Sequence, residues 1–194
     1  MTFSVSTQES FGRVLSYGLR STASNILAAG SLAELKADEA ILKSDAFKRI
    51  MLTVSGMNFR IIFIVHYKNN DQMVGLVKQS SQDNSQVTSN NQNYETVDAF
   101  FLEMGNRFCG EAKRLCHEAF DCLGMSTPYV LSQMTAMSDM HSKNLKSSHH
   151  VQFCDQGKAL IAGSIYVYSD TDLVLDLPET TFSEQEGVGE LEFF

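Results

Sequence analysis

The sequence predicts an α+β fold in which two similar halves form one continuous antiparallel sheet with long helices packed on it. Three observations predict this fold. First, apolar residues recur at a helical period for about seven turns from Tyr94. Second, two pairs of segments alternate apolar and polar residues, and each pair flanks a short turn. Third, a helix followed by a hairpin occurs twice along the chain. Elements repeated in this order place two hairpins in one sheet. We expect a single domain, 1–194, with pseudo-repeat halves at about 6–78 and 94–177.

The composition is that of a globular chain with a sizeable core. Of the 194 residues, 43% are hydrophobic, which suits one large domain or a duplicated one. No run approaches the roughly 18 apolar residues that a membrane-spanning helix needs, and the N-terminus has no basic segment leading into an apolar one. We therefore expect a cytoplasmic protein without membrane contact, whose four cysteines are reduced thiols.

The negative charge is concentrated near the end of the chain. No Lys or Arg follows Lys158, whereas the same segment holds the acids Asp170, Asp172, Asp176, Glu179, Glu184, Glu186, Glu190 and Glu192. The negative charges of these eight acids add up to the whole net charge of −8, so the rest of the chain is neutral. It therefore has no basic field to hold nucleic acid. Residues 178–194 form an acidic tail, which is interpreted either as a docking peptide or as a segment folded back on the domain.

The first half of the chain is predicted to contain a helix and a hairpin. The helix spans Ser6–Ala29, with Gly30 as its stop. Residues 31–46 are polar and poorly patterned. Arg49–Val54 and Phe59–Tyr67 then alternate apolar and polar residues around a Ser-Gly-Met-Asn turn, which predicts a β-hairpin.

A short helix and a linker separate the two halves. Asp71–Lys78 has a helical pattern with Asp71 as its predicted cap. Residues 79–93 are mostly Gln, Ser and Asn, with almost no apolar side chain, and are predicted to be a polar linker.

The second half repeats the layout after its own helix. Pro128–His141 is Met-rich and is predicted to be a connection that packs on the core. His149–Cys154 and Ala159–Ser169 form a second predicted hairpin around an Asp-Gln-Gly turn. Leu173–Leu177 is predicted to be a short strand, ended by Pro178.

The long helical stretch from Tyr94 to Pro128 has two distinct faces. Its apolar stripe consists of Val97, Phe101, Met104, Phe108, Ala112, Leu115, Ala119 and Cys122. The opposite stripe consists of Ala99, Glu103, Asn106, Gly110, Lys113 and His117. Glu103 and Asn106 lie one turn apart, so an acid and an amide can meet the same ligand. Ala99 and Gly110 on either side are small, which leaves room for another protein's surface.

These residues carry a resemblance to a known family. Glu103-x2-Asn106 with Pro128 at the following x21 spacing resembles the signature of the CheC/CheX/FliY-type chemotaxis phosphatases. Gly110 and Ala112 also match that pattern, whereas Ala99 stands where the family has Asp or Ser and Asp98 is one residue off register. In the first half the corresponding motif is incomplete: Thr22-x2-Asn25 lacks the acid, and Phe47 takes the place of the proline. One intact motif is closer to CheX than to the two-site CheC.

The resemblance implies a CheC-like fold, a homodimer and a phosphatase for the phosphoaspartate of a CheY-like response regulator in two-component signalling. The implied catalytic residues are Glu103, which would pair with a lysine of the regulator, and Asn106, which would hold the attacking water. The Mg²⁺ would be supplied by the regulator, so no cofactor is expected on this chain. The alternative is a non-catalytic CheC-like adaptor that binds a receiver domain or a flagellar switch component.

A metal site is the weaker hypothesis for the remaining candidate residues. Cys109, Cys116 and His117 share a flank of the helix, and His141, His149 and His150 follow later. Their spacings match no zinc pattern such as Cys-x2-Cys, so the thiols are interpreted as core residues.

Overall fold

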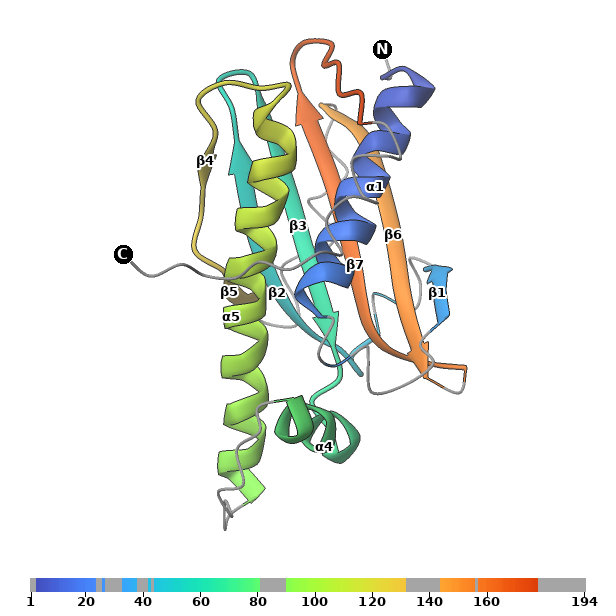
Figure 1. Cartoon of the computed structure of the whole chain (residues 1–194), viewed down its shortest axis with the longest axis vertical. Helices are drawn as coiled ribbons and strands as arrows, with labels where there is room; N and C mark the ends of the chain where they lie inside the picture. Colours follow the sequence, from blue (N-terminus) through green and yellow to red (C-terminus); the bar gives the residue numbers. More distant parts are fainter. Residues whose placement is uncertain are drawn as a thin grey trace, which may run out of the picture.

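The computed structural model describes residues 3–23, 26, 33–37, 42, 44–80, 90–131, 144–155 and 157–177. In this part of the chain a twisted sheet has two long helices packed on one of its faces (Figure 1). The two long helices are α1 (Val5–Thr22) and α5 (Asn90–His117), and the shorter helix α4 (Asp71–Ser80) precedes α5. The predicted α+β class is confirmed.

The sheet contains seven antiparallel strands. They are β1 (Ala33–Lys36), β2 (Lys48–Ser55), β3 (Phe59–Tyr67), β4 (Gly124–Met125), β5 (Tyr129–Leu131), β6 (Leu145–Asp155) and β7 (Lys158–Ser169). Their order is β1-β6-β7-β3-β2-β4, and β5 also pairs with β2. Both predicted hairpins, β2–β3 and β6–β7, are therefore present, and the second is longer than the sequence pattern predicts.

The two hairpins are joined through their inner strands. β3 pairs with β7 in continuous register from Phe59↔Ser169 to Tyr67↔Ile161. The pairing makes one sheet from two similar units, as the sequence order predicts. Side chains alternate across the sheet, so Ile61, Phe63 and Val65 of β3 pack with the helices in the main core.

The sheet face turned away from the helices has its own smaller clusters. Ile64 and Tyr166 are buried there and contact a few half-buried neighbours. His66 and Ser164 are fully buried polar residues on the same face. Since their strands are covered on both faces over this region, the middle of β3 and β7 is almost wholly buried.

The first helix is shorter than predicted. It begins at Val5, capped by Ser4 Oγ, and ends at Thr22 rather than Ala29. The Thr22 hydroxyl donates to Gly18 O (2.7 Å), and Ala23 N–H donates to Leu19 O. Short polar side chains that bond the preceding turn are poor helix formers, and the Ser-Thr-Ala-Ser-Asn sequence supplies several in a row. The predicted stop, Gly30, lies outside the described residues.

The central helix also ends earlier than its apolar stripe suggests. α5 stops at His117, so Ala119 and Cys122 are exposed positions beyond it and do not belong to the buried stripe. Ala119 and Phe120 N–H both donate to Cys116 O, which gives one of the terminal carbonyls of the helix its partners. Cys122 has φ 55°, a left-handed conformation that redirects the chain into β4.

The region between the halves differs in detail from the prediction. Asn70, not Asp71, caps α4, because its Oδ1 accepts from Met73 N–H (3.0 Å). Asp71 instead accepts the hydroxyl hydrogen of Tyr94 in α5 (2.8 Å). The predicted linker 79–93 is shortened at both ends, since α4 reaches Ser80 and α5 begins at Asn90. Residues 81–89 lie outside the described part of the chain.

Short edge strands were missed in two places. β1 lies within 31–46 and pairs with β6. β4 and β5 pair with β2, and β5 occupies the start of the predicted connection Pro128–His141. The methionines of that connection and the acidic tail 178–194 lie outside the described residues.

Leu173–Leu177 is not a strand. It is an irregular segment that crosses α1, where its Leu175 and Leu177 enter the main core. Its backbone bonds to side chains of the helix: Leu175 N–H donates to Thr7 Oγ1 (3.4 Å) and Leu177 N–H to Ser10 Oγ (3.1 Å). Two of its N–H groups thus have helix side chains, and not a neighbouring strand, as partners. We call 173–177 the strap.

Candidate functional site

Glu103 and Asn106 lie on the outward face of α5. Both side chains are exposed, as are Ala99 and Gly110 on the same stripe. The sequence pattern predicts this exposure, and the helix is continuous between the two residues. An acid and an amide one turn apart are therefore accessible to a partner molecule. Their catalytic role remains a prediction.

The opposite face of α5 fixes the helix on the sheet. Val97, Phe101, Met104, Phe108, Ala112 and Leu115 of the predicted stripe are all buried. Phe101 stacks on Tyr67 with ring centroids 4.1 Å apart, and Phe108 meets Phe63 edge-on at 4.9 Å. Contacts of this kind lock side-chain rotamers on both sides of the interface. They give the outward residues a rigid support.

Gly105 sets how closely the motif approaches the sheet. It lies between Glu103 and Asn106 in the sequence, and it is buried. A Cβ added there would lie 3.2 Å from Leu52 Cδ2 and 3.3 Å from Pro128 Cβ. Pro128, the last residue of the sequence motif, therefore packs beneath the helix at the level of the two polar residues. Sequence reasoning missed Gly105, although a Gly inside a long helix costs about 1 kcal/mol and is a signal of close packing.

Asp98 is held by the sheet and does not replace the acid missing at position 99. Tyr67 Oη donates to Asp98 Oδ1 (2.9 Å), and Asn69 Nδ2 donates to the same oxygen (2.8 Å). Lys48 Nζ forms an ion pair with Asp98 Oδ2 at 2.7 Å. Burial and the bond to Asp98 raise the pKa of Tyr67. Asp98 thus anchors the helix, while the outward position is the exposed Ala99.

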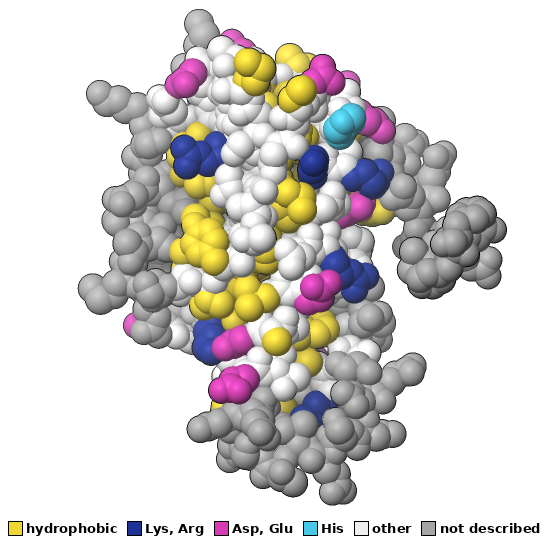
Figure 2. Space-filling model, turned by 90° about the vertical axis from the view of Figure 1, so that its left-hand side faces the viewer, with side chains coloured by type: hydrophobic (Ala, Val, Ile, Leu, Met, Phe, Trp, Pro, Cys, Tyr) yellow, Lys and Arg dark blue, Asp and Glu magenta, His cyan; other side chains and the backbone are white. Residues whose placement is uncertain are grey.

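The surroundings of the motif are mixed in charge and partly apolar. Near the end of α5, Arg114 forms an ion pair with Glu111 (2.6 Å), which raises the pKa of Arg114. Beside the helix, Met125, Tyr129 and Val130 of β4 and β5 expose 51%, 44% and 46% of their surface. Figure 2 shows hydrophobic side chains with scattered charged side chains among them on this side of the molecule. The pattern suits a protein partner better than a small molecule.

The thiols on the flank of α5 are core residues. Cys109 and Cys116 are buried, and burial raises the pKa values of their thiols to about 11 and about 12. His117 is exposed and does not join them. Among the described residues, no group of His, Cys, Asp or Glu side chains is arranged to hold a metal ion, and His141 lies outside them. The described helices also include none with the length and hydropathy of a membrane span.

No family model and no curated protein matches the sequence. Solved structures do match the fold. CheX from a CheX-CheY-BeF3-Mg²⁺ complex of Borrelia burgdorferi has a TM-score of 0.60 at 17% identity, over 86% of this chain and 100% of that chain. A CheC-like superfamily protein from Shewanella sp. PV-4 has a TM-score of 0.57 at 12% identity, over 83% and 98%. CheX from Vibrio vulnificus has a TM-score of 0.52 at 18% identity, over 79% and 95%.

These likenesses extend over most of each chain at low sequence identity, so they concern the architecture. They agree with the α+β sheet of two joined hairpins. The chain has the CheC-like fold of the CheC/CheX-type chemotaxis proteins.

Proposed function

We propose that this protein accelerates hydrolysis of the phosphoaspartate on a CheY-like response regulator. The observation that carries the proposal is the exposed pair Glu103 and Asn106 on a rigidly backed helix of a CheC-like fold. The similar CheX of Borrelia burgdorferi forms a complex with CheY, BeF3 and Mg²⁺. A phosphorylated receiver domain is therefore the partner that we assign to this face.

The reaction needs little chemistry from this chain. Water attacks phosphorus, the bond from phosphorus to the aspartate oxygen breaks, and a carboxylate, inorganic phosphate and a proton are released. Mg²⁺ and a lysine belong to the regulator's own site. The carboxamide of Asn106 hydrogen-bonds the water and orients it in line with the leaving oxygen. The carboxylate of Glu103 pairs with the regulator's lysine and fixes the docking register.

The rate acceleration that Asn106 must supply is modest. Orientation and electrostatic stabilisation by one neutral group account for about 10²-fold in rate, or roughly 3 kcal/mol. Since an amide orients water without a change in its own charge, the rate should depend weakly on pH near neutrality.

The test measures the decay of phosphorylated CheY-like receiver domains with and without the purified protein. Asn106→Ala should remove the acceleration, and Glu103→Ala should weaken both binding and acceleration. Glu95→Gln, an exposed acid on the same helix, is the matched control and should change neither. Thermal denaturation should show that all three variants remain folded. Acceleration by Asn106→Ala equal to that of the native protein would refute the proposal.

Gly110→Ala separates docking from stability. No atom lies within 4 Å of a Cβ added at Gly110, so the helix should gain about 0.5–1 kcal/mol. If the regulator's surface approaches this position closely, the same substitution should weaken the acceleration. A stabilised variant with native acceleration would move the docking surface away from Gly110.

A non-catalytic adaptor is the second candidate, and the exposed Ala99 favours it. The nearby Asp98 is bound to Tyr67, Asn69 and Lys48 and cannot serve in its place. An adaptor would bind the receiver domain and leave its dephosphorylation rate unchanged. In that case Ala99→Asp should introduce a measurable acceleration while Asn106→Ala has no effect. The oligomeric state, which we propose to be a homodimer, is tested separately by light scattering.

A further inference from the structure

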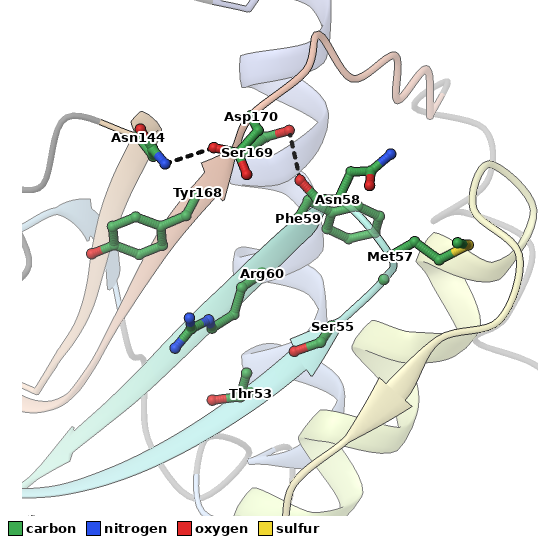
Figure 3. A pocket seen from close by; sticks show the side chains of 11 residues that line it. Thr53, Ser55, Met57, Asn58, Phe59, Arg60, Asn144, Tyr168, Ser169 and Asp170 are labelled. Atoms are coloured by element: carbon green, nitrogen blue, oxygen red, sulfur yellow. Dashed lines mark hydrogen bonds between the residues drawn. The ribbon is translucent and has the colours of Figure 1, made fainter.

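A polar cleft lies on the sheet face away from the helices, at the β2–β3 turn. Its volume is about 510 Å³, within the range of small-molecule sites. The turn residue Asn58, the end of β7 and Asn144 before β6 form its rim (Figure 3). The rim is tied together by hydrogen bonds, because Asn144 Nδ2 donates to Asp170 Oδ1 (2.6 Å) and Asp170 N–H donates to Asn58 O (3.3 Å).

The floor of the cleft is a row of polar side chains across three strands. Ser55 of β2 lies opposite Arg60 of β3, and Arg60 lies opposite Tyr168 of β7. Directly paired residues on one face of a sheet have Cβ atoms about 5 Å apart. Thr53, two residues before Ser55, extends the same face. Figure 3 shows Arg60 between Tyr168 and Ser55.

Arg60 brings the cleft its one cationic side chain among the described lining residues. It is exposed, and no carboxylate in the described part of the chain forms an ion pair with it. The acid on the rim, Asp170, is bound to Asn144. Within the described part of the chain, the guanidinium donors are therefore not paired with a carboxylate.

The charge of Arg60 acts on its neighbour in the row. Burial raises the pKa of Tyr168, and the positive charge of Arg60 opposes this effect. The Tyr168 hydroxyl therefore stays protonated at neutral pH. The row thus offers a guanidinium with the hydroxyl residue Ser55 opposite it and Thr53 on the same face.

We propose that this cleft binds a small phosphate monoester, with its phosphate group on Arg60 and the hydroxyls of Ser55 and Thr53 beside it. Arg offers parallel donors that match two oxygens of a phosphate, and a tetrahedral group has further oxygens for these hydroxyls. The small, mostly polar cleft suits a compact ligand. The site is independent of the proposed function, because it lies on the opposite face of the sheet from Glu103 and Asn106.

The experiment is titration calorimetry of the full chain at constant ionic strength, with inorganic phosphate, glycerol 1-phosphate and sulfate as separate probes. Glycerol 1-phosphate should bind saturably and more tightly than inorganic phosphate. Arg60→Gln should weaken that binding at least tenfold, and Arg60→Lys should retain only part of it because a point charge replaces the planar fork. Arg20→Gln, a distant exposed Arg whose ion pair with Glu34 lies near β1, is the charge-matched control and should bind as the native chain does.

Three outcomes would overturn the proposal. The first is no saturable binding of either phosphate probe, and the second is equal weakening by Arg20→Gln and Arg60→Gln, which indicates nonspecific attraction. The third is equal affinity for sulfate and both phosphates, which makes the cleft an adventitious ion site only. Chemical shifts of the Arg60 side-chain N–H, followed in the same titrations, report whether any binding occurs in this cleft. Thermal denaturation shows whether each variant is folded.

Discussion

His66 is a fully buried histidine, and its surroundings oppose a positive charge. Its Nε2 lies 3.0 Å from Ser164 Oγ, and His150 Nδ1 lies 2.9 Å from the same oxygen. Burial, together with the nearby charges of Arg49 and His150, lowers the pKa of His66 to about 3. His66 is therefore neutral in the folded protein at neutral and mildly acidic pH.

We predict that His66 makes the protein less stable in mild acid. The unfolded chain takes up a proton near pH 6.5, whereas the folded chain does not do so until near pH 3. The unfolded state binds more protons in this window, so the contribution is present above pH 6.5 and is lost as the pH falls. The free energy of unfolding falls by at most about 1.4 kcal/mol per pH unit for one such group. The loss relative to pH 6.5 is therefore about 2 kcal/mol at pH 5.

Urea denaturation at several pH values measures this effect. His66→Gln can still bond Ser164 and should flatten the dependence of unfolding free energy on pH between 6.5 and 5. The comparison of slopes holds even if the variant is less stable overall. Equal slopes for both proteins would show that His66 does not titrate differently on unfolding.

At the scale of elements, the strap 173–177 closes the core against α1. Thr7 and Ser10 are buried residues of the helix whose hydroxyl oxygens accept from strap N–H groups. Arg13 Nη1 donates to Leu177 O at 2.6 Å, one turn further along. The helix side chains at i, i+3 and i+6 thus take the place of a neighbouring strand.

We predict that Ser10→Ala lowers the free energy of unfolding by about 1–2 kcal/mol, because it leaves the buried N–H of Leu177 without a partner. Ser16→Ala in the same helix is the control and should be neutral or slightly stabilising. Hydrogen exchange should show the loss of protection first at Leu175 and Leu177. If Ser10→Ala is as stable as Ser16→Ala, water must hydrogen-bond the Leu177 N–H in place of the Ser10 hydroxyl.

The elements predicted correctly from sequence are those with a long local pattern. The hairpins and α5 repeat apolar residues at their own period over many residues, so burial on one face is evident from the chain alone. The edge strands β1, β4 and β5 have two to four residues, too few for a period. Their pairing depends on distant partners, β6 and β2, and is not encoded locally.

The site was predictable to a similar degree. The exposed positions of Glu103 and Asn106 follow from helical periodicity. The anchoring of Asp98 does not, because its partners come from β2, β3 and the turn before α4. The row Ser55, Arg60 and Tyr168 likewise depends on the register of three strands. Contacts between segments far apart in sequence require the fold before they can be recognised.

At the scale of the whole molecule, the seam between β3 and β7 determines whether the two similar halves unfold separately. Phe63 lies on this seam, paired with Ile165 of β7 and packed edge-on against Phe108 of α5. Its side chain therefore contacts elements from both halves, and the main core has residues from both hairpins and both long helices. A shared core of this kind opposes independent unfolding of either half.

We predict that Phe63→Ala lowers the unfolding free energy by about 3–4 kcal/mol, through lost burial and the cavity left behind. Because the core is shared, native-state hydrogen exchange should report the same decrease in β6 and β7 as in β2 and β3. Leu35→Ala on β1, where half of the side chain is exposed, is the control and should leave both hairpins unchanged. A decrease confined to β2 and β3 would instead mean that each hairpin, with its own helix, is a separate cooperative unit that the seam merely aligns.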